Sequence, residues 1–209
     1  PPAPGTRTVS LFGYENSAAA VLLDCWAQGE TPILVIVPVS RLRPQVESFF
    51  GAAGAASAAD GSSLRRGRLE ARFLPFLPQQ RYDELLWLCD WNFVRGEDSF
   101  VRSQWAGRPM VWQIYAQEEG AHMKKLDAFL DRYAATLEAE LAIALRILWQ
   151  GWNGGPVEPM AGAWKRLSRS GNVLAYHALA WANQLASLGD LAGNLVQFCA
   201  SKRKIARFV

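Results

Sequence analysis

Hydrophobic positions in the first half of the chain follow two alternating periods, which predict strands separated by helices. Short apolar runs typical of buried strands occupy residues 8–14, 32–39, 69–76, 91–94 and 110–114. Apolar positions with the spacing of a helix occupy residues 17–28, 41–50 and 80–89. Strands that alternate with helices favour a parallel sheet covered by helices, so we predict an α/β fold.

The pattern changes after residue 120, where helical spacing continues without strands. One tyrosine and six leucines recur at this spacing: Leu126, Leu130, Tyr133, Leu137, Leu141, Leu145 and Leu148. Residues 172–188 repeat it. We therefore predict that residues 121–209 form a mostly helical layer of the same domain.

Two segments are predicted to lack regular structure. Residues 1–7 begin with Pro-Pro-Ala-Pro-Gly and no Met, which is typical of a linker, so we expect the chain to be a fragment. Residues 51–63 consist mostly of Gly, Ala and Ser, which is typical of a flexible surface loop.

Composition and charge exclude several classes of protein. Half of the 209 residues are hydrophobic, which is enough for a continuous core in one large domain or two small ones. A net charge of +3 is too small to indicate nucleic-acid binding. No apolar run approaches the roughly 20 residues that cross a membrane, and no signal peptide opens the chain. We expect a cytoplasmic protein with no nucleic-acid or membrane partner.

Residue types that often carry chemistry are scattered. The three cysteines lack metal-ligand spacing and are interpreted as buried small side chains: Cys25, Cys89 and Cys199. His122 and His177 are too far apart for a local metal motif, and no Asp-x-Asp motif appears, so we expect no metal. Two basic clusters are interpreted first as solvated surface: Arg65, Arg66 and Arg68, and Lys202, Arg203, Lys204 and Arg207.

A polar turn between two apolar runs is the strongest candidate for a binding site. Residues 95–99 read Arg-Gly-Glu-Asp-Ser, and a predicted helix and an Ala-Gly-Arg-Pro break at 106–109 follow them. Doubly wound sheets bind ligands at the carboxyl ends of strands, where this turn would lie. Asp98 or Ser99 would cap the helix, whose free N–H groups attract anions, and Arg95 would add donors for phosphate. The alternative is a plain helix cap without a ligand.

Aromatic and amide side chains would border the same crevice. Phe12 and Tyr14 end the first predicted strand and Phe76 ends the third, so a flat nucleobase could stack there. The Gln79 amide beside these rings can read the hydrogen-bonding edge of a pyrimidine. Core packing is the alternative for the three rings, because a chain with 9 Trp uses aromatic side chains freely for packing.

Three motifs together resemble one family. They are Phe-Gly-Tyr-Glu-Asn at 12–16, Pro-Phe-Leu-Pro-Gln at 75–79 followed by Tyr82 and Asp83, and Asn-Phe-Val-Arg-Gly-Glu-Asp-Ser-Phe-Val-Arg at 92–102. They resemble the bacterial protein-arginine rhamnosyltransferases that modify elongation factor P, the EarP family. The resemblance implies a GT-B glycosyltransferase of two Rossmann-like domains, of which residues 1–209 would be the C-terminal, donor-binding one. The N-terminal domain, with the acceptor site and the catalytic base, would be absent.

The resemblance also implies a reaction and a set of site residues. The donor would be dTDP-β-L-rhamnose, and an arginine of elongation factor P would receive the sugar with inversion, without a cofactor. Glu97 matches a carboxylate needed for activity and is the expected catalytic residue. Arg95 and Ser99 would bind the diphosphate. The full donor-binding set would be Phe12, Tyr14, Phe76, Gln79, Tyr82, Arg95, Gly96, Glu97, Asp98 and Ser99.

Two other classes stay open at this point. A different GT-B transferase, with another nucleotide-sugar and a small-molecule or lipid acceptor, would share the turn and the Ala-Gly-x-Pro break. A non-catalytic interaction domain would use the turn only as a helix cap and bind a protein through its basic last helix. If the family resemblance holds, the chain alone is expected to bind dTDP and to transfer no rhamnose.

Overall fold

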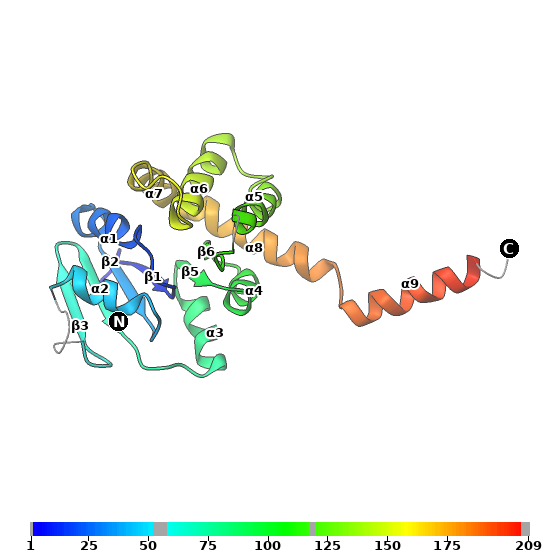
Figure 1. Cartoon of the computed structure of the whole chain (residues 1–209), viewed down its shortest axis with the longest axis horizontal. Helices are drawn as coiled ribbons and strands as arrows, with labels where there is room; N and C mark the ends of the chain where they lie inside the picture. Colours follow the sequence, from blue (N-terminus) through cyan, green and yellow to red (C-terminus); the bar gives the residue numbers. More distant parts are fainter. Residues whose placement is uncertain (1, 52–57, 118–119, 206–209) are drawn as a thin grey trace.

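The computed structural model describes residues 2–51, 58–117 and 120–205, with side chains described as far as residue 201, and it has the predicted α/β architecture (Figure 1). The strands are β1 (Arg7–Leu11), β2 (Ile33–Val37), β3 (Ser63–Arg66), β4 (Leu69–Phe73), β5 (Trp91–Arg95) and β6 (Met110–Gln113). The helices are α1 (Ala19–Gln28), α2 (Arg43–Phe49), α3 (Gln79–Leu88), α4 (Asp98–Trp105), α5 (Ala121–Tyr133), α6 (Ala139–Trp152), α7 (Met160–Arg169), α8 (Gly171–Ser187) and α9 (Leu191–Ile205). The predicted linker at residues 1–7 overlaps the first strand.

The six strands form one sheet in the order β3-β4-β2-β1-β5-β6. All neighbours except β3 and β4 run parallel. Strand β2, Ile-Leu-Val-Ile-Val, is almost entirely buried, as expected for a central strand covered on both faces. The chain order reverses between β1 and β5, so the carboxyl ends of these two strands flank the place where doubly wound sheets bind ligands.

Helices cover both faces of the sheet. Right-handed crossovers between parallel strands place α1 and α2 on one face and α3 and α4 on the other. Helix α7 packs against α1, α6 packs against β6 and α7, and α8 packs against α4. The predicted Rossmann-like sheet with a C-terminal helical layer is therefore confirmed.

The antiparallel edge strand β3 was not predicted from the sequence. It forms a hairpin with β4, in which Arg66 faces Leu69. The basic cluster at residues 65–68 is exposed, as predicted, but two of its three arginines lie on a strand. Mostly exposed polar side chains gave this edge strand no apolar signal in the sequence. Residues 52–57 of the predicted small-residue loop lie outside the described residues.

Three predicted strands end earlier than the apolar runs that marked them. Strand β1 ends at Leu11 and β4 at Phe73, so Phe12, Tyr14 and Phe76 lie in the loops beyond the strands. Strand β2 likewise ends before the Pro38-Val39 pair. An apolar run in the sequence indicates which residues are buried or line a cleft. Where a strand ends depends instead on its hydrogen bonds to the adjacent strands.

Large aromatic side chains fill the space between the sheet and α6 and α7. The ring centroid of Trp164 lies 5.2 Å from those of both Trp26 and Trp91, and Trp152 lies 5.0 Å from Phe93. Trp26, Trp91, Phe93 and Trp152 are each at most 1% exposed. Tilted and edge-to-face pairs at these distances add about 0.5–1.5 kcal/mol each beyond burial of their area. Much of the Trp content therefore holds the helical layer on the sheet.

The last helix, α9, extends away from the sheet and from the helices that flank it (Figure 1). Leu191 and Leu195 are exposed on it. The predicted basic cluster at residues 202–207 begins on α9, but its side chains lie outside the described ones. Within the described part of the chain, no helix is both long enough and apolar enough to cross a membrane.

Candidate functional site

The loops at the carboxyl ends of β1, β2, β4 and β5 border an open crevice of about 700 Å³, which we call the carboxyl-end crevice. All ten residues predicted for donor binding line it: Phe12, Tyr14, Phe76, Gln79, Tyr82, Arg95, Gly96, Glu97, Asp98 and Ser99. Other loops and α4 add residues that were not predicted, among them Val39, Ser40, Arg41 and Arg102. The structure thus brings together segments that lie more than 80 residues apart in the sequence.

The loop after β1 is held in place by a residue that does not line the crevice. The Gln113 side-chain oxygen accepts a hydrogen bond from the Tyr14 backbone N–H at 2.8 Å, and its amide nitrogen donates to the Glu15 carbonyl at 3.3 Å. The Gln113 backbone carbonyl accepts from the Gly96 N–H at 3.0 Å. Since Gln113 is only 8% exposed, one buried residue of β6 sets the spacing of two crevice loops.

The turn between β5 and α4 requires a glycine. Gly96 has a φ of +60°, in the left-handed region that L side chains rarely adopt. A Cβ at this position would lie 2.8 Å from the Tyr14 hydroxyl oxygen. Glycine therefore permits both the turn and the close approach of Tyr14.

Ser99 closes the same turn and does not cap the helix. Its Oγ accepts from the Arg95 backbone N–H at 3.0 Å and donates to the Arg95 carbonyl. Helix α4 has Glu97 at its N-cap, and none of the side chains that the structure describes caps its N–H groups. The prediction that Asp98 or Ser99 caps α4 is therefore wrong, because the Ser99 hydroxyl is committed to the strand end. The uncapped first turn leaves N–H donors for a ligand.

The Arg95 guanidinium lies over two aromatic rings. Its Cζ is 4.5 Å from the Phe12 ring centroid and 4.7 Å from that of Tyr14. Among the described residues it forms no ion pair or side-chain hydrogen bond, and its Nε is buried without a partner. Leaving a buried donor unpaired costs about 1–3 kcal/mol. Arg95 is thus a positioned cation without a counter-charge.

Arg102 also lines the crevice, but its donors are occupied. Nη1 donates to both carboxylate oxygens of Asp83, at 3.0 and 2.8 Å, and Nε donates to Asp98 at 3.0 Å. The Gln79 carboxamide, assigned with its oxygen toward Arg102, accepts from Nε at 3.2 Å and from Nη2. Arg102 is therefore part of the wall rather than a free cation.

Tyr82 completes the aromatic wall. Its ring centroid lies 5.3 Å from that of Phe12. Burial raises the pKa of Tyr82 far above its ordinary value, and Ser99 and Arg95 oppose this shift only in part. The phenol consequently stays protonated at neutral pH and does not serve as a base.

Comparison with known proteins identifies the family. A family model described as Elongation-Factor P (EF-P) rhamnosyltransferase EarP matches residues 1–200. The chain belongs to the EarP family. This confirms the resemblance that the three sequence motifs indicated.

Curated relatives in the EarP family agree with this assignment. The protein-arginine rhamnosyltransferase of Pseudomonas aeruginosa is 45% identical over 196 residues, which cover 94% of this chain and 51% of that protein. The protein of the same name from Neisseria meningitidis is 32% identical over 198 residues, covering 93% of this chain and 52% of that protein. The chain spans about half the length of the curated relatives it matches.

Solved structures support the fold of this EarP family member. One, described as the structural basis for EarP-mediated arginine glycosylation of translation elongation factor EF-P, matches with a TM-score of 0.83 and 38% identity. The match covers 96% of this chain and 62% of that one. A mutant O-GlcNAc transferase of Thermobaculum terrenum matches with a TM-score of 0.54 and 14% identity, over 98% of this chain and 36% of that one. At that identity the likeness shows a shared fold alone.

The two carboxylates in the EarP-family turn have different surroundings. The Asp98 side chain is 79% exposed and pairs with Arg102. Glu97 is exposed and forms no ion pair with any residue that the structure describes. Glu97 is thus the carboxylate of the turn that is free to meet positive charge in the crevice, and its catalytic role stays a prediction.

Sequence analysis of the EarP motifs missed Arg41 and Arg102. Arg41 follows the carboxyl end of β2, and only the strand order shows that β2 adjoins β1. Arg102 stood within the third motif, but its contacts with Asp83 and Gln79 depend on how α4 packs against α3. Two features of the sequence could have pointed to them. Arg41 is a cation just after a predicted strand, and Arg102 is a cation one helical turn after the polar turn at residues 95–99.

The prediction for the three cysteines was only partly right. Cys89 is buried, but Cys25 is half-buried and Cys199 is exposed, so the interpretation of all three as buried side chains is wrong. Cys199 lies on α9, where the other residues of its turn are also exposed. His177 packs against Tyr133, with ring centroids 4.9 Å apart. Across residues 2–51, 58–117 and 120–201, no three or more His, Cys, Asp or Glu side chains could hold a metal ion.

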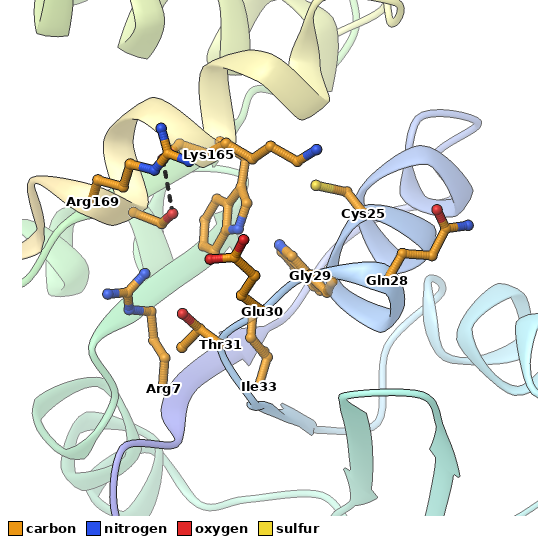
Figure 2. Close-up of a pocket in the computed structure, with 12 residues that line it drawn as sticks. Arg7, Cys25, Gln28, Gly29, Glu30, Thr31, Ile33, Lys165 and Arg169 are labelled. Atoms are coloured by element: carbon orange, nitrogen blue, oxygen red, sulfur yellow. Dashed lines mark hydrogen bonds between the residues drawn. The ribbon is translucent and has the colours of Figure 1, made fainter.

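A second cavity lies at the amino-terminal ends of β1 and β2, and we call it the amino-end cavity (Figure 2). Its volume is about 220 Å³. Figure 2 shows Lys165 and Arg169 on α7 at one side of the cavity, with the Lys165 side chain extending toward Cys25, and Glu30 and Thr31 on the connection that follows α1. Its ionisable side chains are Arg7, Cys25, Glu30, Lys165 and Arg169.

Proposed function

We propose that the protein containing this chain transfers rhamnose from dTDP-β-L-rhamnose to an arginine of elongation factor P, with inversion, in the cytoplasm. This chain supplies the donor-binding half, and the carboxyl-end crevice holds the dTDP. Membership of the EarP family supports the reaction class, because curated members carry the name protein-arginine rhamnosyltransferase. The description of the solved relative supports elongation factor P as the acceptor.

The unpaired guanidinium of Arg95 is the observation that carries the proposal. A diphosphate in the crevice would supply the counter-charge that Arg95 lacks, through the charge-assisted hydrogen bonds that arginine forms with phosphate. The uncapped start of α4 adds N–H donors and the positive end of a helix dipole. Both features favour the diphosphate of a nucleotide-sugar.

Exposed and half-exposed aromatic side chains on the crevice wall support a nucleobase-binding site beside the diphosphate. Phe76 is 79% exposed on the crevice wall. Phe12 and Tyr82 pack together on the wall, and Gln79 lies at the start of α3. A base that stacks in this part of the crevice covers apolar ring surface and meets an amide at its edge.

The chemistry divides into departure and attack. As the glycosidic bond breaks, negative charge grows on the diphosphate and positive charge grows on the sugar ring. Donors already placed at Arg95 and the start of α4 stabilise the departing diphosphate. The free carboxylate of Glu97 can orient the sugar or stabilise its positive charge.

Attack by the acceptor requires a further group. A guanidinium stays protonated at neutral pH, so an arginine is a poor nucleophile unless a carboxylate holds it and accepts a proton. Inversion places this base on the sugar face opposite the diphosphate. We assign it to the half of the longer relatives that this chain does not cover, so the chain alone binds donor without transferring sugar.

Calorimetric titration and a transfer assay together test the proposal. The chain and the full-length protein are each titrated with dTDP, UDP and GDP, and each is incubated with dTDP-β-L-rhamnose and elongation factor P. We expect saturable, dTDP-selective binding by the chain and rhamnosylation only by the full-length protein. Selective binding of GDP, or no dTDP binding by either protein, would overturn the donor assignment. Rhamnosylation by the 209-residue chain would overturn the assignment of the base.

A Glu97→Gln variant of the full-length protein tests the proposed catalytic carboxylate. The substitution keeps the size and polarity of the side chain and removes its charge. We expect the dTDP affinity to stay within about twofold, because a surface substitution shifts free energies by about 0.5 kcal/mol or less. Transfer is expected to fall by about 100-fold or more, by analogy with the loss of other transition-state electrostatic groups. Full transfer activity would rule the residue out.

A further inference from the structure

We infer that Arg102 is a positioning residue that determines base specificity: held by Asp83, it fixes the Gln79 carboxamide with its NH₂ group toward the carboxyl-end crevice. The fixed amide then selects a pyrimidine that presents a carbonyl oxygen at this edge. The inference deepens the proposed function and rests on it, because it concerns how the same crevice chooses its nucleotide.

Four side chains form a network centred on Arg102 between α3 and α4. Gln79 and Asp83 are four residues apart on α3, and Asp98 and Arg102 are four residues apart on α4, so each pair lies on one face of its helix. The two helices pack against each other. The Arg102 side chain meets Asp83 and Gln79 across this contact and Asp98 on its own helix.

Asp83 gives the guanidinium a single orientation. Both of its oxygens accept from Nη1 of Arg102, at 3.0 and 2.8 Å, and the two side chains are only 28% and 24% exposed. Charge-assisted bonds of this kind are directional as well as strong. With Nη1 held by Asp83, the Nε and Nη2 edge is directed at Gln79.

The orientation of the Gln79 amide follows from the chemistry of arginine. A carboxamide has an accepting oxygen and a donating NH₂ group, whereas a guanidinium only donates. The oxygen must therefore face Arg102, where it accepts from Nε at 3.2 Å and from Nη2. The NH₂ group is then turned away from Arg102, and Gln79 lines the crevice.

A fixed donor distinguishes two classes of pyrimidine. Uracil and thymine carry a carbonyl oxygen at position 4, which accepts a hydrogen bond, whereas cytosine carries an amino group, which donates one. An unrestrained glutamine could rotate its amide to suit either base. When Arg102 holds the amide, the Gln79 NH₂ group faces the amino group of a bound cytosine. Both groups are donors and remain unpaired, which lowers the affinity for cytosine nucleotides.

The affinities for dUDP and dCDP test the inference, because these nucleotides share sugar and phosphates and differ only at the base edge. The chain, Arg102→Met and Arg81→Met are each titrated with both by calorimetry. Arg81 is a matched control on α3, an exposed arginine whose one ion pair among the described residues is with Glu84 on the same helix. We expect the chain and Arg81→Met to bind dUDP about tenfold more tightly than dCDP, and Arg102→Met to bind the two within about twofold.

A Gln79→Glu variant tests base selection separately from stability. If Arg102 and its partners only stabilised the fold, this substitution would not change the preference between dUDP and dCDP. A carboxylate can pair with Arg102 through one oxygen and present the other oxygen, an acceptor, to the crevice. The preference should then reverse, with dCDP bound more tightly than dUDP. This variant keeps the network and its charge partner, so it remains informative if thermal melting shows that Arg102→Met is unfolded.

The outcomes separate the two proposals. If Arg102→Met is folded and keeps the parental dUDP-to-dCDP ratio, or if Gln79→Glu still prefers dUDP, the role of Arg102 is overturned while the donor-binding crevice stands. Equal weakening of both nucleotides in Arg102→Met would mean that the residue only holds α3 to α4, which also overturns the inference. Absence of saturable binding of dTDP, dUDP and dCDP to the parent chain would instead overturn the proposed donor site.

Discussion

The carboxyl-end crevice and the amino-end cavity both contain arginines beside aromatic side chains, yet they differ in the helix ends that border them. The crevice has the start of α4, whereas the amino-end cavity has the ends of α1 and α7, at Gln28 and Arg169. Helix N-termini carry partial positive charge and C-termini partial negative charge. In the crevice the dipole adds to Arg95, and in the cavity it offsets Lys165 and Arg169.

This difference shows why counting cations is a poor guide to an anion site. In a parallel α/β sheet, helices run back against the strands, so helix N-termini gather at the carboxyl edge of the sheet. The amino-end cavity also contains the Glu30 carboxylate, and burial lowers the pKa of Arg7, with Asp90 opposing the shift. Among the described residues, neither Arg95 nor the cations of the amino-end cavity form ion pairs, so the helix ends are what distinguish the two regions.

Removing single arginines from the two regions gives the largest expected contrast. Arg95→Ala should weaken dTDP binding by about 10- to 100-fold, because hydrogen bonds to charged groups contribute about 1.5–3 kcal/mol. Arg7→Ala and Arg169→Ala should leave the affinity within about twofold, since they lie at the opposite edge of the sheet. Calorimetric titration measures all three. Equal weakening by Arg7→Ala would break the comparison between the two regions.

Adding a methyl group at one glycine of the crevice and at one glycine of α7 should give changes of opposite sign. Gly96→Ala should lower the free energy of unfolding by about 1–2 kcal/mol or more, because the left-handed conformation is strained for alanine and the Cβ would meet Tyr14. Gly162→Ala, in α7 with open space around its Cβ, should raise it by about 0.5–1 kcal/mol. Urea denaturation reports both changes. A neutral Gly96→Ala variant would mean that the turn relaxes freely.

Two serines allow a finer comparison of the same regions. Ser99→Ala should cost about 1 kcal/mol of stability and weaken dTDP binding several-fold, because it removes the hydroxyl that accepts from the Arg95 N–H. Ser168→Ala removes only a hydroxyl that donates to the Lys165 carbonyl in α7, so it should change stability by about 0.5 kcal/mol or less. The same denaturation and titration experiments apply. Similar losses for both variants would show that Ser99 has no special place in the turn.

The smallest expected effect concerns Cys25 in the amino-end cavity. Burial raises the pKa of its thiol, and nearby Lys165 only partly opposes the shift. The thiol is therefore protonated at pH 7, and its alkylation should accelerate as the pH rises through 9 and beyond. Mass spectrometry of iodoacetamide-treated protein should find exposed Cys199 modified before Cys25. Rapid modification of Cys25 at pH 7 would show that the cavity stabilises anions after all.

Local pattern predicted the parts of the fold that depend on burial. The strands around Val35 and Phe93 and the heptad-like leucines of α5 and α6 follow from apolar spacing alone. The ten site residues converge in one crevice because the carboxyl ends of parallel strands share one edge. Their individual roles in binding stay predictions.

Features that depend on packing between distant elements could not be predicted. Strand β3 is polar on the exposed edge of the sheet, so its pairing with β4 left no periodic signal. The hydrogen bonds of Arg102 to residues of α3 depend on the contact between α3 and α4. Whether Arg95 is unpaired depends on which side chains of the described residues lie near it in space. A residue's availability is a property of its neighbours in space, which one sequence does not contain.

The bonds of Gln113 bear on the rate at which the crevice should load and release its ligand. One buried side chain ties the Tyr14 loop and its backbone ties the Gly96 turn, so both loops hold their positions without a ligand. Because no segment has to rearrange before the nucleotide binds, the association rate constant should be similar among crevice variants. Variants that bind strongly and variants that bind weakly should therefore differ mainly in their dissociation rate constants.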